Sequence, residues 1–354
     1  MLLYPRKAPM FVKFPSIESF RHLRKRVELN ATYTGRDEYD NPQYGPLVPG
    51  SLPTLTFRGT TKLHGTNSGV VRTPDGEFHP QSRGRTLTRT EDNYNFAKFV
   101  LDEVSAEVWE DLFRMVFGSM CDKFACVLYG EVCGKGVQSK VGVCALDRMF
   151  VMFAARLVNE DEEVREWLPL ASMVEAPDSR VFNVFNSGFF EIEIDFNKWE
   201  EAQEKLTELT LIVENNCPVA AKLGEGGIGE GIVWQCTTPS YESSQFWFKT
   251  KGEKHKGSSS KTKVEADPAK VANVAAFVEQ TVTEARCLQG IDYLIEMGHP
   301  LTKKSTGAYL KWVGGDVFKE EYDVLEVSGL TRKDVGGPVA NFARKWFFSY
   351  LDRS

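Results

Sequence analysis

Short segments rich in β-branched and aromatic residues, separated by turn residues, dominate the chain between about Leu52 and Lys251. The clearest are TLTFRGTTKL, NSGVVRT, FACVLYGEV, RMFVMFAARL, GIVWQC and FWFKTK. Such segments are typical of β-strands, because branched and aromatic side chains pack well on a pleated surface. Two stretches with apolar residues at helical spacing interrupt them, NFAKFVLDEVSAEVWEDLFRMVF and FNKWEEAQEKLTELTLIVEN. This pattern predicts a mixed α+β domain.

The pattern changes after a polar segment, KGEKHKGSSSKTKVEADP, which is typical of a linker or loop. The residues from Pro268 to Gly298 and the stretch from Gly337 onward have strong helical patterns. We therefore place a domain boundary between about Lys256 and Pro268. This gives an α+β domain over residues 51–260 and a small all-helical domain over residues 268–354. Residues 1–50 form an N-terminal extension of unassigned role, which we expect to pack on the α+β domain.

The composition is that of a globular protein, because 42% of the 354 residues are hydrophobic and 26% are charged. No run approaches the roughly 18 apolar residues that a membrane-spanning helix needs. The N-terminal MLLYPRKAPMFVKFPS is interrupted by prolines and does not resemble a secretory signal. Seven cysteines are present and none forms a CxxC pair, which favours reduced thiols and disfavours a zinc site. We therefore expect a cytoplasmic protein that does not bind membranes.

The net charge of −6 disfavours nucleic acid as a partner, since binding to phosphates is largely electrostatic. The charges are unevenly distributed, however. Basic and acidic residues are equal in number from Pro268 onward, so the excess of acidic residues lies before it. Basic clusters occur at residues 21–26, 83–89 and 249–263. Each cluster alone is typical of a solvated surface, yet local basic surfaces leave nucleic-acid binding open.

Two glycine-rich segments resemble phosphate-binding loops but lack the required context. GEGGIG at residues 224–229 fits GxGxxG, which must follow a strand and open a helix, whereas the strand-like GIVWQC follows it here. GEVCGKGVQSK, which starts at Gly130, has too few residues between its first two glycines for a P-loop, and a glycine follows Lys135. Neither segment predicts a nucleotide site.

The segment GTTKLHGTNSGV at residues 59–70 combines a lysine at the end of a strand-like run with a histidine and a turn. If Lys62 is a nucleophile, its amine must be neutral at working pH, although free lysine has a pKa near ~10.4. Neighbouring cations or loss of solvent favour the neutral amine. A single lysine or histidine is more often a surface or core residue. Six residues in this order indicate a reactive site.

KLHGTN at residues 62–67 resembles the nucleophile motif KxHGTN of the RNA ligase 2 family, which includes the bacteriophage T-even type and the trypanosome RNA-editing ligases. This family belongs to the covalent nucleotidyltransferases. Its DNA-ligase and mRNA-capping relatives carry Lys-x-Asp-Gly-x-Arg instead. The histidine and asparagine of KLHGTN therefore favour the RNA ligase branch.

Further segments resemble family motifs in the same order along the chain, and the resemblance extends from about residue 52 to at least residue 334. They are QSRGR (81–85), EDNYNFAKF (91–99), LYGEVCGKGVQ (128–138), FVMFAARL (150–157), GEGIVWQC (229–236), FKTK (248–251) and TEARCLQGIDYL (283–294). One position departs from the pattern, because the family commonly has aspartate where this chain has Ala154.

The resemblance implies a role for each matching residue. It places Lys62 as the nucleophile, His64 at the pyrophosphate or metal waters, Glu131 at the ribose, Phe153 on the adenine, Glu230 at Mg²⁺ or Mn²⁺ and beside Lys62, Lys249 and Lys251 at the α-phosphate, and Leu63, Asn67 and Arg83 as further nucleotide contacts. Residues two apart on a strand project from the same face, so one of Lys249 and Lys251 can meet the α-phosphate while both lower the pKa of Lys62.

The fold implied by the resemblance is a nucleotidyltransferase domain, an ATP-grasp-like ligase domain of antiparallel sheets with flanking helices, followed by a small helical domain. The implied activity is ATP-dependent joining of RNA 3′-hydroxyl and 5′-phosphate ends through a lysyl-AMP intermediate. The implied partner is RNA, as nicked duplex or free ends, with RNA/DNA hybrids also open, and no protein partner can be inferred. The location would be the cytoplasm, or the host cytoplasm for a phage-encoded protein. The alternatives are a DNA ligase, an mRNA-capping guanylyltransferase and a non-catalytic RNA-binding protein with this fold.

Overall fold

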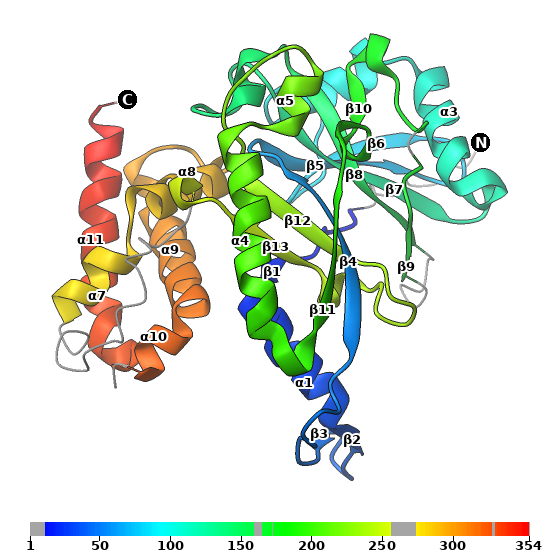
Figure 1. The fold of residues 1–354 in the computed structure, drawn as a ribbon. Helices are drawn as coiled ribbons and strands as arrows, with labels where there is room; N and C mark the ends of the chain where they lie inside the picture. Colours follow the sequence, from blue (N-terminus) through cyan, green and yellow to red (C-terminus); the bar gives the residue numbers. More distant parts are fainter. Residues whose placement is uncertain (1–10, 159–164, 172, 256–273, 328–329, 354) are drawn as a thin grey trace. The chain divides into compact units, whose positions relative to one another are not determined.

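The computed structural model describes residues 11–158, 165–171, 173–255, 274–327 and 330–353. The chain divides into two compact units, Met1–Gly252 and Glu253–Ser354 (Figure 1). The predicted boundary between Lys256 and Pro268 and most of the predicted linker lie outside the described residues. No helix in the described ranges combines the length and the apolar character that crossing a lipid bilayer requires.

The first unit contains two sheets. The first sheet has the strand order β1-β13-β12-β4-β11, which is Glu18–Ser19, Phe248–Lys251, Gly231–Cys236, Thr54–Lys62 and Phe190–Asp195. The second sheet has the order β10-β8-β7-β5-β6, which is Val181–Asn183, Met149–Val158, Ala125–Cys133, Thr66–Arg72 and Phe78–Ser82, and β9 (Arg165–Leu168) pairs with β8. The prediction of antiparallel sheets is correct for most pairs. Two pairings at the sheet edges are parallel, β1 with β13 and β10 with β8, so both sheets are mixed.

Helices flank the two sheets. In the first unit they are α1 (Phe20–Thr32), α2 (Phe96–Lys98), a π-helical turn (Phe99–Glu103), α3 (Ala106–Phe117), α4 (Trp199–Asn215) and α5 (Pro218–Lys222). The helix α4 lies along the first sheet (Figure 1) and buries Leu206 and Val213 against Ile232 and Trp234. The second sheet packs against α2 and α3, where Trp109 and Phe113 are fully buried. A hairpin of β2 (Tyr33–Arg36) and β3 (Pro42–Tyr44) follows α1.

The stretch from Asn95 to Phe117, predicted as one helical segment, is interrupted. The π-helical turn ends at Glu103, and α3 starts anew at Ala106. Ser105 has an extended backbone, and its side-chain oxygen accepts a hydrogen bond from the backbone N–H of Val108. This is an N-terminal cap, which competes with a continuous helix because it satisfies a free backbone donor. The predicted helix over residues 196–215 agrees with α4.

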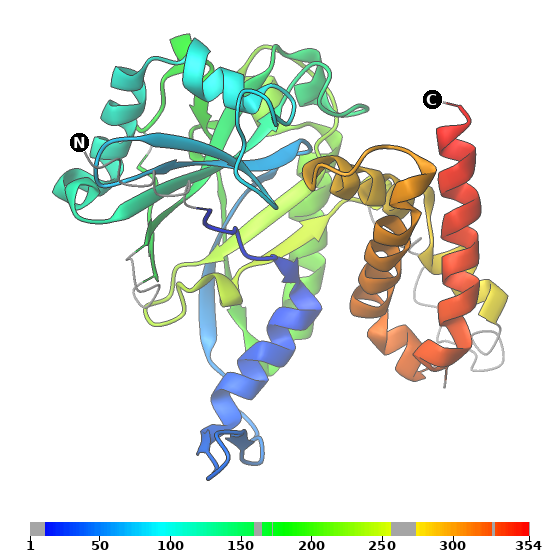
Figure 2. The same ribbon diagram turned by 180° about the vertical axis from the view of Figure 1, so that it is seen from behind.

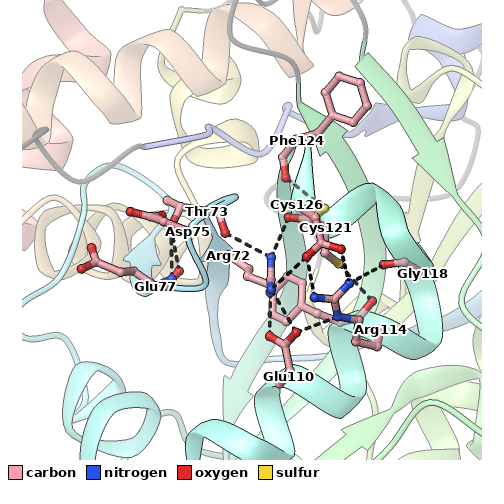
Figure 3. A network of polar contacts seen from close by, with 12 residues as sticks. Arg72, Thr73, Asp75, Glu77, Glu110, Arg114, Gly118, Cys121, Phe124 and Cys126 are labelled. Carbon is pink, nitrogen blue, oxygen red and sulfur yellow. Dashed lines mark hydrogen bonds and ion pairs between the residues drawn. The ribbon is translucent and has the colours of Figure 1, made fainter.

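An ion-pair network around the buried Arg72 fixes α3 to the end of β5 (Figure 3). The guanidinium of Arg72, whose side chain is 4% exposed, donates to both carboxylate oxygens of Glu110, at 2.7 and 2.9 Å, and to the carbonyl of Cys121 at 2.6 Å. Arg114 binds the same carboxylate and Asp122. Hydrogen bonds from Arg72 outweigh the opposing effect of burial and lower the pKa of Glu110. The network therefore satisfies a buried arginine on the face of the second sheet that α3 covers.

The second unit is helical. Its helices in the described ranges are α7 (Val274–Thr281), α8 (Glu284–Glu296), α9 (Thr306–Glu320), α10 (Tyr322–Val327) and α11 (Arg332–Leu351). Buried side chains of α8, α9 and α11 form one apolar core. In it the rings of Tyr309 and Phe347 stack with centroids 4.4 Å apart. The last helix begins before the predicted Gly337, because Thr331 and Asp334 form a capping box at its start.

Candidate active site

Lys62, Gly231 and Lys251 lie side by side on three neighbouring strands of the first sheet. Gly231 of β12 pairs with Lys62 of β4 and with Lys251 of β13. Directly opposed residues of antiparallel strands project from the same face, so the two lysines flank a position without a side chain. A Cβ atom at Gly231 would lie 2.1 Å from the carbonyl oxygen of Thr250, so the close approach of the strands requires glycine.

The carboxylate of Glu230 lies between these lysines. Its Oε2 is 2.6 Å from Lys62 Nζ and 3.3 Å from His64 Nδ1, and its Oε1 is 3.3 Å from Lys251 Nζ. The side chain of Glu230 is only 4% exposed, whereas those of Lys62 and Lys251 are 21% and 17% exposed. The structure thus brings together four predicted site residues from three separate segments of the chain.

The charges of this cluster determine the protonation state of Glu230. Burial raises the pKa of the carboxyl group, because a charge is costly in the protein interior. The ammonium groups of Lys62 and Lys251 and a hydrogen bond from His64 outweigh burial and hold the pKa well below its ordinary value. Glu230 is therefore a carboxylate at neutral pH and holds the three basic groups around it.

This lowered pKa predicts a loss of stability in acid. As the pH falls through the ordinary value of 4.5, the unfolded state takes up a proton at Glu230 before the folded state does. The contribution of the cluster to the free energy of unfolding is therefore complete above that pH. It is lost as the pH falls toward the pKa of Glu230 in the folded state. We expect the difference in free energy of unfolding between the wild type and Glu230→Gln to shrink below pH 4.5, measured by urea unfolding. Other carboxylates titrate in both proteins, so their effect cancels in the difference. If the difference in free energy of unfolding does not change with pH, Glu230 is not a carboxylate in the folded protein.

The turn after Lys62 carries the chain from the first sheet to the second, because β4 and the following strand β5 belong to different sheets. In this turn the backbone N–H of Gly65 donates to Glu131 Oε1 at 3.1 Å. A Cβ atom at Gly65 would lie 2.2 Å from a backbone oxygen of β7, so the turn needs glycine here. Asn67 pairs with Glu131 across β5 and β7, and both side chains project from one face. Both residues therefore lie beside the turn that carries Lys62.

Phe153 occupies a bulge in β8. The register between β7 and β8 shifts between Tyr129 and Gly130, which leaves Phe153 without a partner in the ladder. Bulges redirect side chains and are frequent next to active sites. Phe153 is partly buried, and its ring meets that of Phe14 edge-on with centroids 5.2 Å apart. Its carbonyl oxygen accepts a hydrogen bond from Gln235 of the first sheet at 3.1 Å.

The remaining predicted residues lie on the same elements. Lys249 is two residues before Lys251 on β13, so both project from one face of the strand. Arg83 directly follows β6, and its Nη2 donates to Ser16 Oγ at 3.3 Å. Leu63 is 5% exposed, and its side chain packs in an apolar cluster. The Ala154 side chain, 4% exposed, also lies in an apolar cluster.

The structure describes all residues of two predicted basic clusters, 21–26 and 83–89. Arginines in both clusters have partners within the protein. Arg85 donates to the carbonyls of Glu91 and Asp92, and Arg89 pairs with Asp102 at 2.7 Å. In α1, Arg24 lies over the ring of Trp199 at 4.1 Å and pairs with Glu28. These arginines therefore also stabilise local structure. Part of the third cluster, residues 249–263, lies outside the described residues.

The residues of this site could bind a divalent metal together with the phosphates of a nucleotide. Among the described residues no three histidine, cysteine, aspartate or glutamate side chains converge on one point. Mg²⁺ is commonly bound through one or two carboxylates together with substrate phosphates and water. Glu230 offers one buried carboxylate beside the lysine cluster. This donor set matches a metal shared with a nucleotide rather than a permanent metal centre.

The sequence patterns did not indicate the roles of two glycines or of the N-terminal segment. Gly65 and Gly231 directly follow the predicted site residues His64 and Glu230, and this adjacency was a usable signal for close backbone approach. The rejection of GEGGIG is confirmed, because a strand, β12, follows it. Residues 11–19 carry no motif, and their contacts with the site depend on pairing with distant strands.

The first unit is an α+β unit whose two sheets are joined by the lysine-bearing turn, and a lysine–glutamate–lysine cluster lies at the end of β4. A family model described as RNA ligase matches residues 55–251, more than half of the chain. The chain belongs to the RNA ligase family.

Comparisons with solved structures give low similarity scores. A Naegleria gruberi RNA ligase mutant with ATP and Mn has a TM-score of 0.40 and 16% identity over 70% of this chain and 57% of that chain. The Naegleria gruberi RNA ligase with pyrophosphate has a TM-score of 0.36 and 16% identity, over 69% and 57% of the two chains. An archaeal ATP-dependent RNA ligase has a TM-score of 0.37 and 15% identity, over 89% and 65%. The chain thus spans less than two thirds of each of these proteins. A search of curated proteins gives no significant match.

Proposed function

We propose that the chain is an ATP-dependent RNA ligase of the RNA ligase 2 type, which seals nicks in duplex RNA. The observation that supports this most is the contact of Lys62 with Glu230 at 2.6 Å, beside Lys251 and at the turn between the two sheets. A lysine nucleophile needs a neighbouring group that orients it and cations that stabilise the phosphate it attacks. The cluster supplies both.

The proposed reaction has three transfers. Lys62 Nζ attacks the α-phosphorus of ATP, a P–N bond forms and pyrophosphate leaves. The terminal 5′-phosphate of the RNA then attacks the same phosphorus, so that the P–N bond breaks and a 5′–5′ pyrophosphate bridge forms. Finally the RNA 3′-hydroxyl attacks the 5′-phosphorus, a phosphodiester forms and AMP leaves. Each transfer moves negative charge onto phosphate oxygens, which the cations of the cluster are placed to stabilise.

The residues of the site divide these tasks. Lys62 must lose a proton before it attacks. Glu230 Oε2 accepts a hydrogen bond from Lys62 Nζ at 2.6 Å and would orient the amine. Lys249 and Lys251 on β13 would meet the α-phosphate, and His64 would orient the leaving pyrophosphate. A divalent ion held by Glu230 and the phosphates would neutralise phosphate charge.

The nucleoside part of ATP would lie against the second sheet. Glu131 and Asn67 project from one face beside the Lys62 turn, and Glu131 is proposed to bind the ribose. Phe153, directed by its bulge, is proposed to stack on adenine, and Arg83 to contact the nucleotide. Leu63 would contribute backbone groups only. Selection of RNA would depend on A-form shape and contacts to the 2′-hydroxyl, with the helical unit helping to hold the duplex.

A two-stage assay tests this proposal. We expect the protein to form a covalent adduct with α-labelled ATP but not with α-labelled GTP, and then to seal a nicked RNA duplex in preference to a nicked DNA duplex. An RNA/DNA hybrid panel would define which strand must be RNA. An adduct with GTP would indicate a capping-type guanylyltransferase, and preferential sealing of DNA would indicate a DNA ligase. RNA binding without any adduct would identify a non-catalytic RNA-binding protein.

A further inference from the structure

The segment Phe11–Ser19, which lies before the family-matched residues 55–251, is fixed to the second sheet through Val12. The side-chain amide of Gln81 accepts from the Val12 backbone N–H at 3.0 Å and donates to its carbonyl at 2.6 Å, and the Tyr129 hydroxyl donates to the same carbonyl at 3.0 Å. Val12 is 9% exposed, so these bonds satisfy backbone groups that would otherwise be buried alone. Side chains of β6 and β7 therefore hold the segment in place.

The next buried residue of this segment, Phe14, packs against the proposed adenine-stacking residue. Its ring lies edge-on to Phe153 at 5.2 Å between centroids and contacts Tyr129 at 5.0 Å and Trp167 at 5.9 Å. Phe153 lies in a bulge, where the β7–β8 ladder does not hold it directly. Phe14 is 7% exposed, so its ring is a fixed support against which Phe153 rests. Ala154 belongs to the same apolar cluster as Phe14, so the position where the family commonly has aspartate faces this segment.

Two further contacts reach other parts of the proposed nucleotide site. Ser16 Oγ accepts a hydrogen bond from Arg83 Nη2 at 3.3 Å. The short strand β1 then pairs in parallel with β13, with Ser19 opposite Lys249. Figure 2 shows the segment, in dark blue, leading into α1. One continuous stretch thus contacts Phe153, Arg83 and the strand of Lys249.

We propose that residues 11–19 are a positioning segment for the nucleotide site, in which Phe14 orients Phe153 and Ser16 orients Arg83. This inference rests on the proposed function, because it assumes that these two residues contact ATP. Phe14 and Ser16 act through their neighbours and take no part in the chemistry. Their loss should therefore weaken nucleotide binding more than it slows phosphoryl transfer.

Initial rates of self-adenylylation against ATP concentration test this in the full chain. We expect Phe14→Ala to raise KM for ATP about tenfold with kcat changed less than about twofold, and Phe14→Leu to raise it less. Ser16→Ala should raise KM about threefold and Ser16→Thr should restore it. Phe196→Leu, a fully buried aromatic in the core of the first sheet, and Ser51→Ala, an exposed loop serine, are matched controls. An equal rise in KM for Phe196→Leu at the same melting temperature would overturn the inference.

A double-mutant cycle separates positioning from general stability. If Phe14 acts through Phe153, the effect of Phe14→Leu on KM should disappear in a Phe153→Leu background. Additive effects would overturn the assignment. ATP affinity in a Lys62→Ala background, measured by calorimetry with and without Phe14→Leu, gives the same test without any transfer. If the wild type forms no adduct but Phe14→Leu still weakens ATP binding, the proposed function fails and the positioning role stands. If neither binding nor transfer responds to Phe14→Leu, the positioning role fails alone.

Discussion

Replacing Lys62 with alanine should abolish the covalent AMP adduct. No adduct above background is expected with α-labelled ATP, because no other group has been assigned the attack on the α-phosphorus. The label on the wild type should survive denaturing electrophoresis and be lost in acid, as expected for a P–N bond. Lys205→Ala is a matched control, because Lys205 is an exposed lysine of α4 that pairs with Glu208. An adduct of normal yield in Lys62→Ala would place the nucleophile elsewhere.

The same variant distinguishes loss of the nucleophile from loss of the fold. An RNA that already carries a 5′-adenylate bypasses the first two transfers, so its sealing does not require the Lys62 amine as a nucleophile. We expect Lys62→Ala to seal this substrate while it fails to seal RNA with ATP. Failure with both substrates, in a folded protein, would show that Lys62 has a structural or binding role beyond nucleophilic attack.

Replacing Glu230 with alanine should reduce adenylylation at least ~100-fold, since a precisely placed electrostatic group commonly contributes this much. The change removes the group that holds Lys62, His64 and Lys251 and leaves the two ammonium groups facing each other across Gly231. Loss of one member of a buried ion pair also destabilises a fold by roughly 3 kcal/mol. Adenylylation rates and urea unfolding should therefore both change. Glu230→Asp, which keeps the charge on a shorter side chain, should restore part of the activity.

A matched variant separates the two consequences of this change. Glu110 also pairs with two basic residues, Arg72 and Arg114, but lies in α3 on the outer face of the second sheet. Glu110→Gln should lower the stability of the protein without a comparable loss of adenylylation. If Glu110→Gln and Glu230→Ala reduce adenylylation equally at equal stability, the effect at Glu230 is not specific to the site.

The family and the fold class were predictable because the information is local. The order of residues in KLHGTN and in the later motifs favoured the RNA ligase family, and the match over residues 55–251 confirms that family. Segments rich in β-branched and aromatic residues predicted the strands. The six segments named as examples correspond to β4, β5, β7, β8, β12 and β13. The roles of the individual site residues within the family stay predictions.

Local sequence patterns could not predict the structure where two backbone signals compete, or where strands pair that are far apart in the sequence. The stretch from Asn95 to Phe117 has helical periodicity throughout, yet the cap at Ser105 interrupts it. The parallel pairing of β1 with β13 joins segments more than two hundred residues apart, and a two-residue strand has no recognisable pattern of its own. Residues 11–19 therefore had no predicted role.

The residue types of the cluster could be identified from local motifs, because Lys62, His64, Glu230 and Lys251 each lie in one of them. The position of Glu230 between two lysines depends on the folded sheet, in which Gly231 aligns β4 with β13. The same holds for the edge-on contact of the Phe14 ring with the Phe153 ring, which joins residues far apart in the sequence. The physical reason is that a charge pair or a ring contact between distant segments depends on strand register and burial, which arise only when the sheets pair and pack.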